Sequence, residues 1–263
     1  MDLHVMLPIF VINLLPFLSA VYVAFGVRYF WQKQSNRINF FSLTVFACAI
    51  YCFGYYLEIQ TYDPGVMLWV RGFEFIGVMA LPTVGMAYIA QATNRRLFSR
   101  RTFTLLSILS SALWISYITN PYHHLFYTSL TTGHGAIGTV VQTVKGPFYY
   151  LLLAYYCVFL VLSVYFLASA IFGAVTPDKG RDKKILLAAF LFPWIPLLAI
   201  MLGYDNYMDP APFAIILMSA LFLTNEIIND LEDKGAIGKQ YQQLVLQMQQ
   251  CLLLILRSLQ ADR

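Results

Sequence analysis

Three charged residues lie within or at the end of long apolar stretches of this sequence: Glu58, Arg71 and Glu74. Arg71 and Glu74 are three positions apart, so on a helix they share one face, while Glu58 closes the preceding apolar stretch. Charged groups in an apolar medium are costly and often mark functional sites. Two interpretations are open. Either the carboxylates neutralise Arg71 and hold two helices together, or one of the charges meets a ligand.

Aromatic and polar residues near the same ends of the apolar stretches extend this cluster to a candidate small-molecule site. Such sites are usually aromatic-lined cavities with a few convergent polar groups. The predicted ligand-binding residues are Tyr55, Glu58, Trp69, Arg71, Glu74, Phe75, Asn120, His123, Trp194 and Asp209. Because 16% of all residues are aromatic, a belt of aromatic side chains at a membrane surface is the alternative explanation for many of them.

Histidine and cysteine, which commonly bind metals, are poorly placed to do so here. His123 and His124 are adjacent and point to different sides on most backbones, so a structural role in a turn is expected for His123. Cys48 and Cys52 are one helical turn apart, but no histidine or carboxylate lies nearby in the sequence to complete a metal site. The sequence predicts no metal, no cofactor and no catalytic group.

Most of these residues lie in seven apolar stretches, and most of the stretches come near the ~20 residues that a helix needs to cross a bilayer. The stretches run roughly from 7 to 27, 39 to 59, 66 to 92, 103 to 119, 147 to 174, 185 to 203 and 211 to 228. Only 11% of the residues are charged, against about 25% in an average soluble domain. We predict an all-α membrane protein, a seven-transmembrane helix bundle, in which Pro82, Pro193 and Pro196 kink or break two spans.

Basic residues between these stretches predict the orientation. They collect in alternate connections, at Arg28, Lys33, Arg37, Arg95, Arg96, Arg100, Arg101, Lys179, Arg181, Lys183 and Lys184. The opposite ends hold only Arg71 and Lys145. The positive-inside bias therefore predicts an outer N-terminus and a cytoplasmic C-terminus. Since the first stretch begins close to Met1 without a basic leader, we expect a retained helix rather than a signal peptide.

The outer connection from about 120 to 146 has a different pattern from the rest of the membrane domain. It contains several glycines and an alternation of threonine and valine from Thr139 to Val144. A glycine-flanked alternation of this kind is typical of a hairpin. We expect a small β-lid over the outer mouth of the bundle.

The sequence divides into a membrane domain, residues 1–228, and a cytoplasmic extension, residues 229–263. In the extension, apolar residues are spaced four and three apart in alternation, at Tyr241, Val245, Met248, Leu252, Ile255 and Leu259. This spacing is typical of the seam of a left-handed coiled coil, so we predict a parallel homodimer. A single amphipathic helix on the membrane surface is the alternative, but its polar face is usually rich in lysine and arginine. Here glutamine dominates, and Gly235 and Gly238 form a plausible joint before the seam.

Several short motifs together resemble the seven-transmembrane sensor domain at the N-terminus of bacterial histidine kinases and of some cyclic-di-nucleotide enzymes. The resemblance covers about residues 10 to 225. It rests on Tyr55-Tyr56-Leu57-Glu58, Arg71-Gly72-Phe73-Glu74-Phe75-Ile76-Gly77, Leu81-Pro82, Thr119-Asn120-Pro121-Tyr122-His123-His124-Leu125-Phe126, Gly146-Pro147-Phe148 and Asp209-Pro210-Ala211-Pro212-Phe213. It implies a sensor of the bacterial cytoplasmic membrane that passes a signal inward to an output domain.

The chain departs from that family in having no recognisable output enzyme before Arg263. The sequence thus predicts a receptor that binds a small ligand in the outer half of its bundle and signals through its C-terminal helix to a histidine kinase or a cyclic-di-nucleotide enzyme, in cis or in trans. Its partners would be the ligand, the lipid bilayer, a second copy and that enzyme, but no nucleic acid.

Other classes of membrane protein fit the sequence less well. A retinal protein needs a lysine in its last helix, and this sequence has no lysine there. A haem protein needs histidines at mid-depth in the membrane, whereas His4, His123, His124 and His134 are all expected at the outer side. A small-molecule transporter remains the alternative, although transporters usually have internal repeats and polar or broken helices at the midplane.

Overall fold

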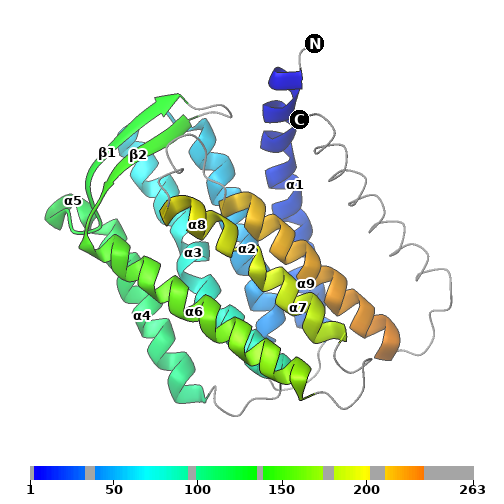
Figure 1. The fold of residues 1–263 in the computed structure, drawn as a ribbon. Helices are drawn as coiled ribbons and strands as arrows, with labels where there is room; N and C mark the ends of the chain where they lie inside the picture. Colours follow the sequence, from blue (N-terminus) through cyan, green and yellow to red (C-terminus); the bar gives the residue numbers. More distant parts are fainter. Residues whose placement is uncertain are drawn as a thin grey trace. The chain divides into compact units, whose positions relative to one another are not determined.

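A computed structural model describes residues 3–32, 39–93, 99–134, 139–173, 181–201 and 211–233 of the chain. The elements in chain order (Figure 1) are α1 (Leu3–Gln32), α2 (Phe40–Gln60), α3 (Pro64–Ala92), α4 (Arg100–Ile118), α5 (Asn120–His123), β1 (Tyr127–His134), β2 (Thr139–Lys145), α6 (Pro147–Phe172), α7 (Arg181–Leu191), α8 (Trp194–Met201) and α9 (Ala211–Asp233). The chain divides into two units, residues 1–222 and 223–263. All contacts described below lie within the first unit, and of the second the structure describes only the end of α9.

Five of the described helices are long and apolar enough to cross a membrane. Their spanning segments are Asn13–Trp31, Phe40–Gln60, Pro64–Ala92, Arg100–Ile118 and Pro147–Phe172. They coincide with the first five apolar stretches of the sequence, so the prediction of a helical membrane protein is confirmed. In α9, Ala214–Ile228 is a shorter apolar segment.

The sixth apolar stretch is divided between two helices, α7 and α8. The break falls at Phe192 and Pro193, between the end of α7 at Leu191 and the start of α8 at Trp194. Proline has no amide hydrogen to donate and its ring clashes with the preceding turn. The predicted break at Pro193 is therefore confirmed, while the helices continue through Pro82 in α3 and through Pro196 in the first turn of α8.

Local sequence signals set where the helices begin. Asn39 caps α2 by accepting a hydrogen bond from the amide of Ser42 (3.4 Å), and Asp63 caps α3 by accepting one from the amide of Gly65 (2.7 Å). Asp63 precedes Pro64, the residue type favoured at the first helical position. These caps fix the ends of the two helices from which the charged cluster comes.

Two glycines allow α2 and α3 to pack closely. A Cβ atom added at Gly54 would lie 2.5 Å from the Cα of Glu74, and one added at Gly77 would lie 2.5 Å from the carbonyl oxygen of Ala47. Small residues allow this close backbone approach in membrane helices. Cys48 and Cys52 are buried and unbridged in α2, where they serve as small packing residues.

Buried hydroxyl groups join α3, α4 and α6 further along the bundle. The Thr83 hydroxyl lies 2.9 Å from that of Ser110 and 2.7 Å from the phenol of Tyr155. Such interhelical hydrogen bonds contribute about 0.6 kcal/mol each in membrane proteins. They keep α6 in register with α3.

The connection between α5 and α6 forms the predicted β-hairpin. Strands β1 and β2 pair antiparallel, with Leu130 opposite Thr143 and Gly133 opposite Val140. In β2 the side chains alternate, since Thr139 is buried and Val141 and Thr143 are partly buried, while Gln142 and Val144 are exposed. One face of the hairpin therefore turns toward the helices, and Figure 1 shows both strands at one end of α2 and α3.

Candidate functional site

A cavity of about 200 Å³ lies under the hairpin, between the helices of the first unit. Its walls are Tyr51, Tyr55 and Glu58 of α2, Arg71, Glu74, Phe75, Val78 and Leu81 of α3, Tyr127 of β1, Thr139, Val141, Thr143 and Lys145 of β2, Tyr149, Leu152, Leu153, Tyr156 and Leu160 of α6, and Pro193, Pro196, Ala211 and Ile215. On each long helix these residues follow the three- and four-residue spacing of one helical face. The inner face of β2 closes the cavity at the hairpin end.

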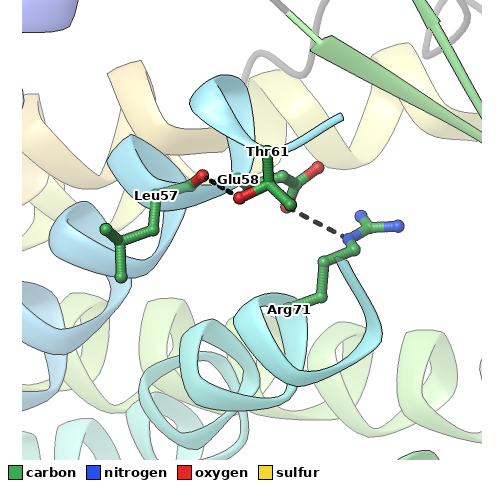
Figure 2. A network of polar contacts seen from close by, with 4 residues as sticks. All are labelled: Leu57, Glu58, Thr61 and Arg71. Atoms are coloured by element: carbon green, nitrogen blue, oxygen red, sulfur yellow. Dashed lines mark hydrogen bonds and ion pairs between the residues drawn. The ribbon is translucent and has the colours of Figure 1, made fainter. Parts of the chain in front are cut away.

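An ion pair between α2 and α3 forms the charged part of this wall. The Nε atom of Arg71 lies 3.1 Å from Oε2 of Glu58, and the two side chains are only 13% and 7% exposed. Figure 2 shows the Nε atom of Arg71 facing the Glu58 carboxylate across the space between α3 and α2. The prediction that a carboxylate neutralises Arg71 and links two helices is therefore confirmed for Glu58.

The end of α2 holds Glu58 in place for this pair. The Thr61 hydroxyl donates to the carbonyl oxygen of Leu57 (2.8 Å), and the Thr61 amide donates to the carbonyl oxygen of Glu58 (3.0 Å) (Figure 2). These bonds satisfy the last carbonyl groups of the helix, which have no partner within it. Glu58 thus sits on an ordered final turn.

Aromatic rings surround the Arg71 guanidinium. Its Cζ atom lies 5.8 Å from the ring centroids of both Phe75 and Tyr127, within the ~6 Å range of a cation–π contact. The Phe75 ring also stacks on Tyr117, with 4.3 Å between the ring centroids. Burial raises the pKa of Tyr127 above its ordinary value, although the charge of Arg71 acts in the opposite direction. The Tyr127 phenol therefore stays protonated at neutral pH.

A second cation reaches the cavity from the hairpin. Lys145 is the last residue of β2, and its ammonium nitrogen lies 5.2 Å from the ring centroid of Tyr149. Glu74, from α3, is only 2% exposed. Among the described residues of the wall, the charged ones are two carboxylates and two cations.

A buried hydroxyl on the cavity wall has no hydrogen-bond partner among the described residues. Thr139, the first residue of β2, is 3% exposed, and its Oγ1 atom lacks a partner there. Buried polar groups are nearly always hydrogen-bonded, so an exception calls for an explanation. A ligand or a water molecule in the cavity would supply the missing partner.

Asn120 fixes the hairpin to the helices. Its side-chain oxygen accepts hydrogen bonds from the amides of Phe126 (2.8 Å) and Tyr127 (3.1 Å), and its nitrogen donates to the carbonyl oxygen of Tyr127 (2.9 Å). His123, one turn later, accepts a hydrogen bond at Nδ1 from the amide of Leu125 (3.0 Å). Both residues shape the turn that leads into β1, the role expected for His123.

Replacing Asn120 with leucine should detach the start of β1. Three buried hydrogen bonds would be lost and two amides left unsatisfied, so we expect the free energy of unfolding to fall by about 2–4 kcal/mol. Thermal unfolding in detergent and limited proteolysis of residues 127–145 would measure this. Tyr122→Ala, at a residue that is 89% exposed, is the control. Equal protease resistance in both variants would contradict the anchoring role.

The structure brings together five of the predicted ligand-binding residues: Tyr55, Glu58, Arg71, Glu74 and Phe75 all line the cavity. Asn120 and His123 belong to the turn that leads into β1. Trp69 is 66% exposed and does not line the cavity. Trp194 does not line the cavity either, although Pro193 before it and Pro196 after it do. Asp209 lies outside the described residues.

Sequence reasoning did not select the hairpin and α6 residues of the wall. Tyr127, Thr139, Lys145 and Tyr156 were not among the predicted site residues, yet all line the cavity. The alternation that predicted the hairpin also separates its inner residues from its outer ones. The alternation places Thr139 and Lys145 on one face of β2, but it does not tell which face turns toward the cavity.

Comparison with known proteins gives one family match. A family model described as the N-terminal 7TM region of histidine kinase matches residues 15–227. No curated protein matches the sequence.

Proposed function

We propose, on the premise that this chain belongs to the family of N-terminal 7TM regions of histidine kinases, that it is a membrane receptor for a small molecule that binds in the cavity under the hairpin. The family match supports a sensor domain of a signalling protein. In this proposal α7 with α8 forms the sixth span and α9 the seventh, which completes the seven-helix bundle.

The cavity itself carries the proposal. It places an ion pair, a buried threonine hydroxyl without a partner among the described residues, and several tyrosines around one cavity. A concave, mostly apolar site with a few convergent polar groups is the usual form of a small-molecule site.

The route of the signal follows from the elements that meet at the cavity. Pro193 and Pro196 at the α7–α8 break and Ile215 of α9 all line it, so a ligand contacts the last spans directly. α9 runs on to Asp233, toward the C-terminal segment in which a coiled-coil seam is predicted. That segment lies outside the described residues. Through it a parallel homodimer would pass the signal to a cytoplasmic kinase or cyclic-di-nucleotide enzyme, in cis or in trans.

The positive-inside pattern supports an orientation in which the hairpin faces the outside of the bacterial cytoplasmic membrane. A cysteine at Thr131, which is exposed on β1, should react with a membrane-impermeant maleimide in intact cells. A cysteine at Arg100, exposed at the start of α4, should react only after lysis. The wild-type protein, in which Cys48 and Cys52 are buried, gives the background. The reverse pattern would overturn the orientation.

Filling the cavity tests the receptor proposal. Leu152 lines the cavity and is 6% exposed, whereas its neighbour Leu151 is 50% exposed. Protein purified from its native host in mild detergent should carry a small molecule detectable by native mass spectrometry. We expect Leu152→Trp to lower its occupancy about tenfold or more, because overpacking a filled site costs about 1–3 kcal/mol. Leu151→Trp should leave the occupancy unchanged.

A second variant separates binding from folding. Thr139→Val removes the buried hydroxyl but keeps the shape of the side chain, so it should leave thermal stability unchanged and still weaken ligand occupancy. Equal occupancy in the wild type, Leu152→Trp and Thr139→Val would mean that the cavity is not the site. Exchange of the co-purified compound across proteoliposome membranes would instead favour the transporter alternative.

A further inference from the structure

We infer that a molecule in the cavity acts on α3 through Tyr156, whose hydroxyl replaces the backbone donor that Pro82 removes from this helix. Tyr156 is then a positioning residue, and the bound molecule carries a hydrogen-bond acceptor that competes for its hydroxyl. The inference rests on the receptor function proposed above and adds the step by which binding changes the bundle.

Pro82 leaves a gap in the hydrogen bonds of α3. It lies inside the helix, which runs from Pro64 to Ala92. In an α-helix the amide of each residue donates to the carbonyl oxygen four positions earlier, which for position 82 is that of Val78. Proline has no amide hydrogen, so the Val78 carbonyl oxygen lacks its usual helical partner. The bilayer core holds no water to replace it.

Tyr156 of α6 supplies the replacement donor. Its hydroxyl donates a hydrogen bond to the carbonyl oxygen of Val78. A neighbouring helix is one of the ways in which backbone groups freed by a proline are satisfied in membrane proteins. α3 can therefore continue through Pro82 without leaving this buried carbonyl group unsatisfied.

The residue before Tyr156 holds the other side of the proline. The phenol oxygen of Tyr155 lies 2.7 Å from the hydroxyl of Thr83. Two consecutive tyrosines of α6 thus bond to α3, one four residues before Pro82 and the other one residue after it. Tyr156 lines the cavity together with Val78, and Tyr155 does not. One of the two contacts that hold α3 at the proline is therefore within reach of a bound molecule.

The Tyr156 hydroxyl has one proton to donate. A molecule that places an acceptor beside it competes with Val78 for that proton. If the hydroxyl turns to the molecule, the Val78 carbonyl must be satisfied by a local 3₁₀ or π adjustment of the helix. Sharp kinks in helices occur at prolines and π-bulges, so this adjustment changes the bend of α3 at Pro82. The molecule favours the second arrangement by its hydrogen bond to Tyr156.

The two parts of α3 on either side of Pro82 have different neighbours. Glu74 and Phe75, before the proline, line the cavity. Tyr88, after the proline, packs against the ring of Phe222 in α9, with 5.6 Å between the ring centroids. Phe222 is fully buried. A change of bend at Pro82 therefore moves the contact between α3 and α9 relative to the cavity.

A double-mutant cycle tests the replacement of the donor. Tyr156→Phe removes only a hydroxyl. In the wild type it should raise the unfolding equilibrium constant in detergent about fivefold or more, because a buried carbonyl group loses its partner. In a Pro82→Ala background the new backbone amide serves that carbonyl, so the same substitution should change the constant by less than about twofold. Tyr165→Phe, at a residue of α6 that is 63% exposed, should change it in neither background.

A distance measurement tests the coupling to the cavity. Nitroxide labels are attached at Gln91→Cys and Phe172→Cys, exposed positions near the ends of α3 and α6, on the full chain with Cys157 and Cys251 replaced by serine. The protein is compared before and after removal of the compound co-purified from its host, with occupancy followed by native mass spectrometry. We expect the distance between the labels to change by about 3 Å or more, since α3 extends ~14 Å beyond Pro82 and sharp kinks exceed ~20°.

Pro82→Ala separates binding from its consequence. Pro82 is not on the cavity wall, so this variant should keep the occupancy of the host compound. It should lose the change in distance, because the new amide satisfies the Val78 carbonyl whichever way the Tyr156 hydroxyl points. Tyr165→Phe should keep both the occupancy and the change in distance.

Three outcomes would overturn the inference. They are that Tyr156→Phe destabilises both backgrounds equally, that the distance is the same in loaded and emptied protein, or that Pro82→Ala keeps the change in distance. In these cases the receptor proposal stands as long as Leu152→Trp lowers occupancy and Leu151→Trp does not. Protein that carries no compound from its host, or that keeps it in Leu152→Trp, would overturn the receptor proposal and this inference together.

Discussion

Arg71→Leu is expected to lower the free energy of unfolding of the membrane domain by about 3–5 kcal/mol, the usual cost of removing one partner from a buried ion pair. The pair spans α2 and α3, with Arg71 Nε 3.1 Å from Glu58 Oε2 and both side chains largely buried. Without Arg71, the Glu58 carboxylate would remain in an apolar environment with its compensating charge gone. Equilibrium unfolding in detergent micelles would measure the loss.

The double variant Glu58→Leu with Arg71→Leu distinguishes the ion pair from general packing. Replacing both partners by apolar residues removes the uncompensated charge, so more than half of the lost stability should return. Arg100→Leu, at an exposed residue of α4, should change stability by no more than about 0.5 kcal/mol. A double variant as unstable as the single one would mean that Arg71 acts through packing on Phe75 and Tyr127, and not through its charge.

The hairpin and the helix break could be predicted because each depends on residues close together in the sequence. Alternating side chains over Thr139–Val144 define a strand without reference to the rest of the chain, and Pro193 ends a helix through its own ring and missing amide hydrogen. The Arg71–Glu58 pair was predictable for a different reason, since charged residues within membrane helices usually pair with one another or with backbone carbonyl groups.

Trp69 shows why membrane depth alone did not define the site. It is close to Arg71 along α3, but two residues correspond to a rotation of about 200° around a helix with 3.6 residues per turn. Arg71, Glu74, Phe75 and Val78 share the face that lines the cavity, so Trp69 points away and is 66% exposed. A prediction of the site must therefore consider both the depth of a residue in the membrane and its position around the helix. The three-residue spacing of Arg71 and Glu74 already indicated which face of α3 carries the site.

Asn120 and Lys145 illustrate the part that could not be predicted. Asn120 binds backbone groups of residues six and seven positions later, and this contact exists only once the turn and the start of β1 have formed. Lys145 reaches the cavity because the hairpin folds back over α2 and α3. Such long-range placement depends on tertiary packing, for which the sequence has no local signal.

The last prediction concerns the C-terminal seam from Tyr241 to Leu259, which lies outside the described residues and stays a prediction. A ligand shifts a two-state equilibrium only by its different affinity for the two states, so some element beyond the cavity must differ between them. We expect the seam to pair in parallel across a dimer. Introducing Leu252→Asp and Ile255→Asp would then place unpaired carboxylates at the buried contact, which is strongly unfavourable.

Disulfide cross-linking measures this pairing. In a Met248→Cys variant that also carries Cys251→Ser, cross-linked dimer should form, and the two aspartates should reduce it about tenfold or more. Gln243→Asp with Gln250→Asp adds the same charge seven residues apart on the polar face and should leave cross-linking intact. If both pairs of substitutions reduce cross-linking equally, charge alone separates the chains. If neither does, the tail is a surface helix, and the signal must leave the membrane domain through another contact.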